Sequence, residues 1–245
     1  MDYFLLSIFF IVAFIYSSAG MGGGSSYTAL MVISGFNYHI IPTASLSLNL
    51  IVTSIGMLNY WRNGHGRIDL IVPLLTTSIP MAYIAGSLPL PIIIFQSILI
   101  STLIFIVIRI YVLKELQISF HLSNNNKLII MYALGAILGF IAGSVGIGGG
   151  IYLVPLIIMF SLGNEQEAAA TGAIFILVNS IVGIIARSKA TEFNIDLILP
   201  FMLVVAIGGI SGSYFGSFKF QAKTIQQIMG IIIIIAIILL FRGIL

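Results

Sequence analysis

The chain has 245 residues, of which 60% are hydrophobic and only 7% are charged, and its mean hydropathy is +1.19. Soluble domains carry roughly 25% charged residues, so this composition excludes a soluble protein and indicates an integral membrane protein. The absence of cysteine excludes a disulfide framework and thiolate chemistry, and a net charge of +3 is too small for a nucleic-acid-binding surface.

Apolar runs, taken in chain order, predict ten helices and an all-α polytopic membrane fold. The runs lie at 3–20, 25–36, 42–61, 69–88, 91–111, 128–146, 151–162, 168–187, 196–217 and 224–244. Most are long enough to span a bilayer, because roughly 20 residues of helix cross its core. The runs 25–36 and 151–162 reach only about 18 Å and predict half-helices. Run 3–20 is expected to be retained, because it lacks a basic start and a cleavage site. Whether it crosses fully or turns back is left open.

The sequence also repeats itself. A shift of 126 residues places Gly22–Gly24 on Gly148–Gly150, and a shift of 127 places Asp69 and Pro73 on Asp196 and Pro200. We therefore predict one transmembrane transport domain, 1–245, with two five-segment repeats, 1–113 and 128–245, joined by a polar linker, 114–127.

The two repeats are expected to be inverted. A half-helix that stopped inside lipid would leave bare backbone there, so each short segment should return to the side it came from. Each repeat then crosses the membrane an odd number of times, and the linker and loop 61–67 face the cytoplasm. Counting positive charges does not decide between the inverted and parallel arrangements.

The glycine runs raise the question of why a membrane segment accepts them, since each glycine in a helix costs about 1 kcal/mol against alanine. A helix N-terminus exposes unpaired N–H groups and the positive end of the helix dipole, and glycine lets a ligand approach closely. Two such ends converging near the midplane would form an anion site without Lys or Arg. The alternative is that the glycines serve close helix packing, and both can hold.

We call the glycine runs Gly22–Gly24 and Gly148–Gly150 the first and the second break. The candidate substrate-binding residues are the glycines of these two breaks and the hydroxyl and amide side chains near them. They are Gly22, Gly23, Gly24, Ser25, Ser26, Ser45, Asn49, Gly148, Gly149, Gly150, Thr171 and Asn179. Ser25 and Ser26 could instead cap their helix. No acid or base lies at the centre of an apolar run, and no His or acidic residues have metal-ligand spacing. We therefore expect no catalytic residue, metal or cofactor, and an enzyme is disfavoured.

Several stretches resemble the sulfite exporter TauE/SafE family of membrane transporters. They are GSVGIGGGIYLVPLI at 143–157, EAAATG at 167–172, RNGHGRIDLIVPLL at 62–75 and GMGGGSSYTALM at 20–31. The resemblance implies a secondary transporter, most often an exporter, of small sulfur-containing anions such as sulfite, sulfoacetate or other sulfonates. The first half lacks the Val-Pro pair of 154–155, and Gly172 stands where such sequences often have Ser.

The main hypothesis is a multi-pass transporter of the cell membrane that works by alternating access. Its partners would be a small anionic substrate and the lipid bilayer, without nucleic acid, and a homo-oligomer is possible. The alternatives are an anion channel that uses the same glycine site, another small organic anion permease, or a non-transporting scaffold. The anion, the coupling ion and the direction of transport are left open.

Overall fold

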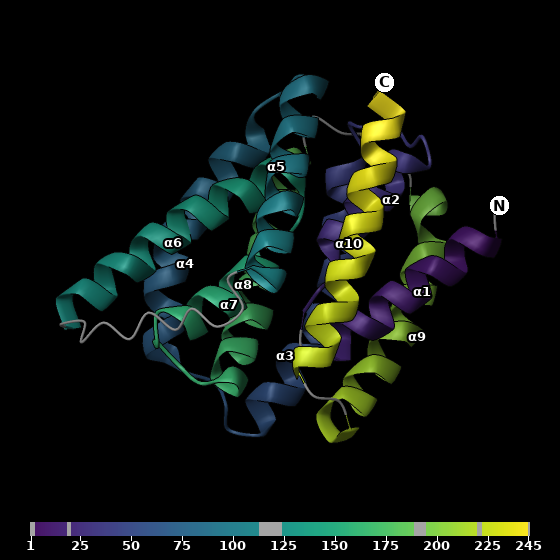
Figure 1. The fold of residues 1–245 in the computed structure, drawn as a ribbon. Helices are drawn as coiled ribbons and strands as arrows, with labels where there is room; N and C mark the ends of the chain where they lie inside the picture. Colours follow the sequence, from purple (N-terminus) through teal and green to yellow (C-terminus); the bar gives the residue numbers. More distant parts are fainter. Residues whose placement is uncertain (1–2, 19–20, 113–123, 189–194, 220–221, 245) are drawn as a thin grey trace.

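The computed structural model describes residues 3–18, 21–112, 124–188, 195–219 and 222–244, which form ten helices and no strand (Figure 1). The helices are α1 (Tyr3–Ser18), α2 (Gly24–Ile33), α3 (Ile41–Arg62), α4 (Ile68–Ser87), α5 (Ile92–Tyr111), α6 (Asn124–Val145), α7 (Gly150–Met159), α8 (Glu165–Arg187), α9 (Ile195–Lys219) and α10 (Ala222–Ile244). Each predicted run is confirmed as a helix, with ends that differ by a few residues. The predicted linker lies outside the described residues up to 123, and 124–127 belong to α6.

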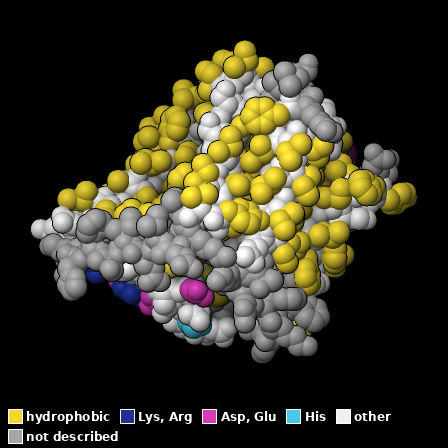
Figure 2. Space-filling view, in the orientation of Figure 1, with side chains coloured by type: hydrophobic (Ala, Val, Ile, Leu, Met, Phe, Trp, Pro, Cys, Tyr) yellow, Lys and Arg dark blue, Asp and Glu magenta, His cyan; other side chains and the backbone are white. Residues whose placement is uncertain are grey.

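The helices are those of a multi-pass membrane protein. Within the described residues, six helices are long and apolar enough to cross a membrane, namely α3, α4, α5, α6, α8 and α9. Figure 2 shows hydrophobic side chains over most of the visible face and charged side chains gathered at its lower edge. Such an apolar exterior suits lipid, because lipid tails replace water around it.

The two short helices begin in the same unusual way. α2 and α7 have 10 residues each, about 15 Å at 1.5 Å per residue. Gly23 and Gly149 precede them with φ of 83° and 78°. This left-handed conformation is open to glycine and strained for residues with a side chain. The central glycine of each run is therefore required by the backbone itself.

The direction of the long helices follows from their contacts. A Cβ added at Gly183 would lie 2.7 Å from Leu46 Cδ1, and one added at Gly56 would lie 3.9 Å from Ala173 Cβ. α3 and α8 are therefore antiparallel. We name the two ends of the bundle by one residue each. The Arg67 end is where α3 ends and α8 begins, and the Arg187 end is where α3 begins and α8 ends.

The short helices leave the middle of the bundle toward opposite ends. Gly24 faces Asn49, and Thr28 donates a hydrogen bond to Ser45 at 3.0 Å, so α2 runs antiparallel to α3, toward the Arg187 end. Gly150 faces Ile176, which lies near the middle of α8, so α7 starts there. Its next turn packs against the preceding part of α8, so α7 runs toward the Arg67 end.

The helix before each break packs on a helix of the other half of the chain. α6 lies parallel to α4, with Gly139 against Ser78 and Gly143 against Ala82. α1 lies parallel to α9, and Gly208 faces Phe10. The α1–α2 pair thus enters from the Arg187 end and returns to it, and the α6–α7 pair does the same from the Arg67 end.

The α4–α6 contact gives a stability prediction. A Cβ at Gly139 would lie 2.5 Å from Ser78 Cα, so Gly139→Ala overpacks the seam, which typically costs about 1–3 kcal/mol. The thermal unfolding midpoint of the purified protein in detergent should fall. Gly56→Ala is the matched control, because its Cβ meets nothing closer than 3.9 Å. Its midpoint should stay the same or rise. Equal midpoints for the two variants would contradict the tight seam.

The helix directions also predict the orientation in the membrane. Most Lys and Arg residues of the described helices and loops lie at the Arg67 end. They are Arg62, Arg67, Arg109, Lys127, Lys219 and Lys223, whereas Arg187 and Arg242 lie at the other end. The Arg67 end should therefore face the cytoplasm. The chain has no cysteine, so single cysteines report topology without background. In intact cells an impermeant maleimide should label Tyr38→Cys and spare His65→Cys, and the reverse pattern would overturn this orientation.

Candidate functional site

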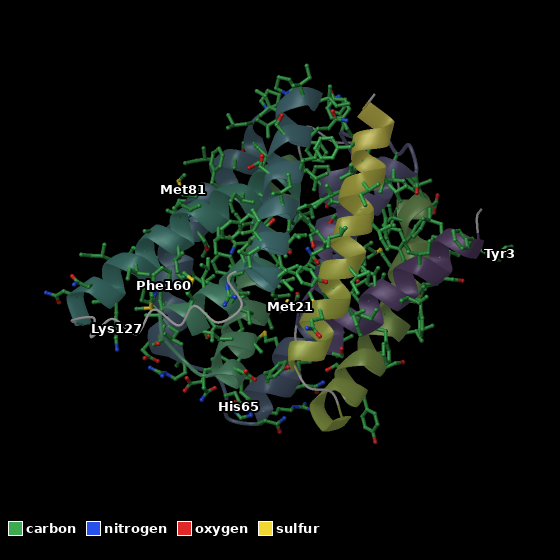
Figure 3. The ribbon with its side chains drawn as sticks, in the orientation of Figure 1. Tyr3, Met21, His65, Met81, Lys127 and Phe160 are labelled. Atoms are coloured by element: carbon green, nitrogen blue, oxygen red, sulfur yellow. The ribbon has the colours of Figure 1, made fainter. Side chains whose placement is uncertain are left out.

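One side chain of α3 touches both glycine breaks. A Cβ at Gly22 would lie 2.5 Å from Asn49 Oδ1, and a Cβ at Gly148 would lie 2.9 Å from Asn49 Nδ2. The same amide nitrogen donates a hydrogen bond to the Ile147 carbonyl at 3.3 Å, and a Cβ at Gly24 would lie 2.6 Å from that carbonyl. We call these residues, Gly22, Gly24, Asn49, Ile147 and Gly148, the junction. Met21, which precedes the first break, lies in the interior of the bundle, whereas Tyr3 and His65 lie at its edges (Figure 3).

Both short helices point uncapped N-termini at the junction. No side chain of the described residues caps α2 or α7. Their first backbone bonds run from Tyr27 N to Gly23 O at 3.0 Å and from Tyr152 N to Gly149 O at 3.2 Å. The N–H groups that precede these bonds lie at the positive ends of two helix dipoles. The junction is therefore electropositive without a cationic side chain of its own.

Close packing explains some of the glycines. A Cβ at Gly149 would lie 2.9 Å from Phe175 Cε1, and one at Gly23 would lie 2.8 Å from Tyr27 Cζ. A Cβ at Gly150 would overlap Ile176. Gly23, Gly149 and Gly150, which are predicted substrate-binding residues, therefore have a structural role in packing, whether or not they also bind a substrate. Gly22, Gly24 and Gly148 have the Asn49 amide among their nearest neighbours, and Gly148 also has a structural role, because its φ is 79° and an added Cβ would lie 2.7 Å from Ile176 Cγ2.

The hydroxyls near the first break hold helices together. The Ser25 and Ser26 hydroxyls lie 3.3 and 2.8 Å from Tyr16 Oη and do not cap α2. Ser45 donates to the Gly24 carbonyl at 3.1 Å while it accepts from Thr28. These hydrogen bonds link α1, α2 and α3. The capping role considered for Ser25 and Ser26 is absent.

The predicted residues of α8 lie elsewhere. Asn179 Nδ2 donates to Ser78 Oγ at 3.2 Å and to the Phe175 carbonyl at 2.8 Å, so its contacts are with α4 and its own helix. Thr171 is buried, and its hydroxyl has no hydrogen-bond partner among the described residues. The repeat position of Asn49 is Phe175, which packs on Gly149. The junction therefore contains one amide and not a symmetric pair.

Arg187 is only 7% exposed, and no pattern in the sequence predicts its burial. Its guanidinium donates to the carbonyls of Gly143, Ser144 and Gly183, the last two at 3.0 and 3.4 Å. Gly143 and Ser144 end α6, directly before the second break. A cation at a helix C-terminus complements the negative end of the dipole. In the sequence Arg187 is an ordinary charge at the edge of an apolar run, because its burial depends on the packing of α6.

A narrow pocket approaches the breaks from α5, α7 and α10. Met21, Ile151 and Tyr152 line it together with Arg109, whose Nη2 donates to the Pro155 carbonyl at 3.4 Å. The pocket volume is about 10 Å³, close to the space that one water needs. It admits no sulfonate until the surrounding helices move. Arg109 is thus a second arginine near the breaks, and its position at the edge of an apolar run does not distinguish it from the other charges in the sequence.

The two halves also meet at the Arg67 end through an ion pair. Arg67 Nη1 lies 3.3 Å from Glu167 Oε1, and the same guanidinium binds Asp69. The hydrogen bond with Asp69 is the main cause that raises the pKa of Arg67 above its ordinary value. Glu167 also completes a capping box with Asn164 at the start of α8. This cluster fixes loop 63–67 to the α8 N-terminus.

Short helices that start inside a bundle of membrane spans are typical of membrane transporters, and the similarity to known proteins places the chain in that class. Residues 5–240 match the sulfite exporter TauE/SafE family, and the chain belongs to this family. The resemblance seen in the sequence is thereby confirmed. The names of its relatives indicate a transporter and not an enzyme.

Several relatives are described as probable membrane transporter proteins. The chain is 27% identical to y4hK of Sinorhizobium fredii, with 93% of each chain covered. It is 27% identical to YjnA of Bacillus subtilis, with 89% of this chain and 91% of the relative covered. It is 28% identical to MJ0441 of Methanocaldococcus jannaschii, with 86% and 84% covered. No solved structure matches the chain significantly.

The Arg187 contacts give a second stability prediction. Arg187→Met removes the side-chain donor of two buried carbonyls in the last turn of α6, those of Gly143 and Ser144, and we expect a net loss of about 1–3 kcal/mol, visible as a lower unfolding midpoint in detergent. Arg62→Met is the matched control, because Arg62 is an exposed arginine at the end of α3. A midpoint for Arg187→Met equal to that of the control would show that these carbonyls do not depend on Arg187.

Proposed function

We propose that this protein is a secondary transporter, working as an exporter, of small sulfur-containing anions such as sulfite, sulfoacetate or other sulfonates. The observation that carries the proposal is an imbalance of hydrogen-bonding groups at the junction. Side chains supply donors to the carbonyls there, with Asn49 serving Ile147 and Ser45 serving Gly24. No described side chain serves the N–H groups of α2 or α7. Surplus donors at two positive helix ends favour an anion.

A sulfite or sulfonate group suits such a site. It is a compact anion with several acceptor oxygens, so N–H groups from two helices can bind it at once. An anion at a partly buried helix N-terminus gains up to about 2 kcal/mol, so two such ends contribute at most about 4 kcal/mol before the costs of association and desolvation are subtracted. A contribution of this size is compatible with the release that a transport cycle requires.

The proposed mechanism uses the two hairpins as gates. We interpret the halves as an inverted repeat, because α2 and α7 leave the junction toward opposite ends. Movement of the α1–α2 hairpin would open the junction to the Arg187 end, and movement of the α6–α7 hairpin would open it to the Arg67 end. Alternating access around a fixed site is the common scheme for transporters with discontinuous helices. None of the five junction residues is an acid, so in this mechanism a coupled proton would travel on the anion itself.

Transport in liposomes tests the proposal. The purified protein should move labelled sulfite or sulfoacetate, and Gly24→Ala should reduce the rate at least tenfold, because its Cβ would enter the junction 2.6 Å from the Ile147 carbonyl. Gly56→Ala, in α3, should transport like the wild type, because its Cβ would make only an ordinary contact with Ala173 Cβ at 3.9 Å. Unchanged transport by folded Gly24→Ala would exclude the junction as the site.

The alternative functions predict other outcomes in the same liposomes. An anion channel would give currents far above the turnover of a carrier. A permease for other small organic anions would transport carboxylates but neither sulfite nor sulfoacetate. Neither alternative has an observation in its favour beyond the glycine site itself.

A further inference from the structure

Asn49 presents one particular atom to the junction. The residue is fully buried, and its Nδ2 donates to the Ile147 carbonyl at 3.3 Å. Its Oδ1 has no hydrogen-bond partner among the described residues. That oxygen faces Gly22, where an added Cβ would lie 2.5 Å away. The junction therefore contains a buried acceptor that lacks a donor.

The orientation of the amide is fixed by its surroundings. Exchanging Nδ2 and Oδ1 would place the amide oxygen against the Ile147 carbonyl, and two acceptors would then face each other without a hydrogen between them. Asn49 must therefore direct its oxygen away from Ile147, toward the first break. An unsatisfied acceptor in a buried place costs free energy, which a ligand recovers if it brings a donor.

The donor must belong to a species that tolerates this electrostatic environment. A metal cation or an ammonium group would meet the positive ends of two helix dipoles. A hydroxyl group carried by an anion avoids this repulsion, because the negatively charged group of the same molecule binds the N–H groups at the helix ends. We infer that Asn49 selects, among small sulfur-containing anions, those that carry a hydroxyl donor, namely protonated sulfite and hydroxyalkanesulfonates. This inference rests on the proposed transport function.

The selection should be strong. A site with a buried hydrogen-bonding group rejects a ligand that lacks the matching partner far better than an apolar pocket rejects a ligand of the wrong size. We expect at least a tenfold difference in transport between two anions of equal charge that differ in a single hydroxyl group.

The test compares 2-hydroxyethanesulfonate with ethanesulfonate in liposomes that contain the full chain. The wild type should transport the hydroxyl compound at least ten times faster at limiting concentration. Asn49→Leu should bring the ratio close to one. Asn59→Leu is the matched control, because Asn59 is also an α3 amide but donates to Ser213 Oγ, and it should keep the wild-type ratio. The wild-type ratio decides the selection even if Asn49→Leu does not fold.

A second measurement uses sulfite alone. Its transport should rise as the pH falls and sulfite gains a proton, whereas ethanesulfonate transport should stay flat over the same range. Equal rates for the two sulfonates in the wild type would overturn the selection while leaving the transport function intact. If folded Asn49→Leu keeps the wild-type ratio of the two sulfonate transport rates, Asn49 is not the residue that makes the selection. If the wild type transports both sulfonates equally, and its transport depends on sodium while that of Asn49→Leu does not, then Asn49 Oδ1 binds a cation and not a hydroxyl donor. Failure to move any of these anions would refute the proposed function itself.

Discussion

A chain that turns back inside a membrane must find partners for every backbone group that the turn exposes, because lipid offers none. This constraint shapes the breaks of this protein. Carbonyls at the breaks are served by side chains from other helices, by Arg187 at the end of α6, by Asn49 at Ile147 and by Ser45 at Gly24. The N–H groups on the other side of each break receive no such side-chain partner from the described residues. The proposed anion site consists of these N–H groups, which have no side-chain partner in the described part of the chain, whereas the carbonyls at the breaks do.

The fold could be predicted from the sequence to a large extent, for physical reasons. A membrane-spanning helix must be predominantly apolar over about 20 residues, so composition delimits the spans. A triple glycine is unfavourable inside such a helix, and its duplication predicts both breaks. The left-handed φ at Gly23 and Gly149 explains why the middle position of each run is glycine.

The candidate site could be predicted only in part. The glycines and Asn49 do come together, because α3 runs beside α2 and passes the second break. Asn179 lies apart from the junction, and Ser25 and Ser26 pair with Tyr16, since side-chain partners across helices leave no periodic pattern. Arg187 was missed because its burial depends on α6, some forty residues earlier in the chain. The binding role of all these residues stays a prediction.

Among the described residues, no arginine binds the end of α1 in the way that Arg187 binds the end of α6. Trp61 occupies the repeat position and lies partly exposed against Gly66. The last turn of α1 instead bonds through its own hydroxyls, with Ser17 donating to the Gly209 carbonyl at 2.6 Å and Tyr16 paired with Ser25 and Ser26. The two hairpins are thus held by different kinds of contact. In the proposed carrier, this difference would set which conformation the empty protein prefers and how fast each opens. It would leave the final distribution of solute to the gradients across the membrane.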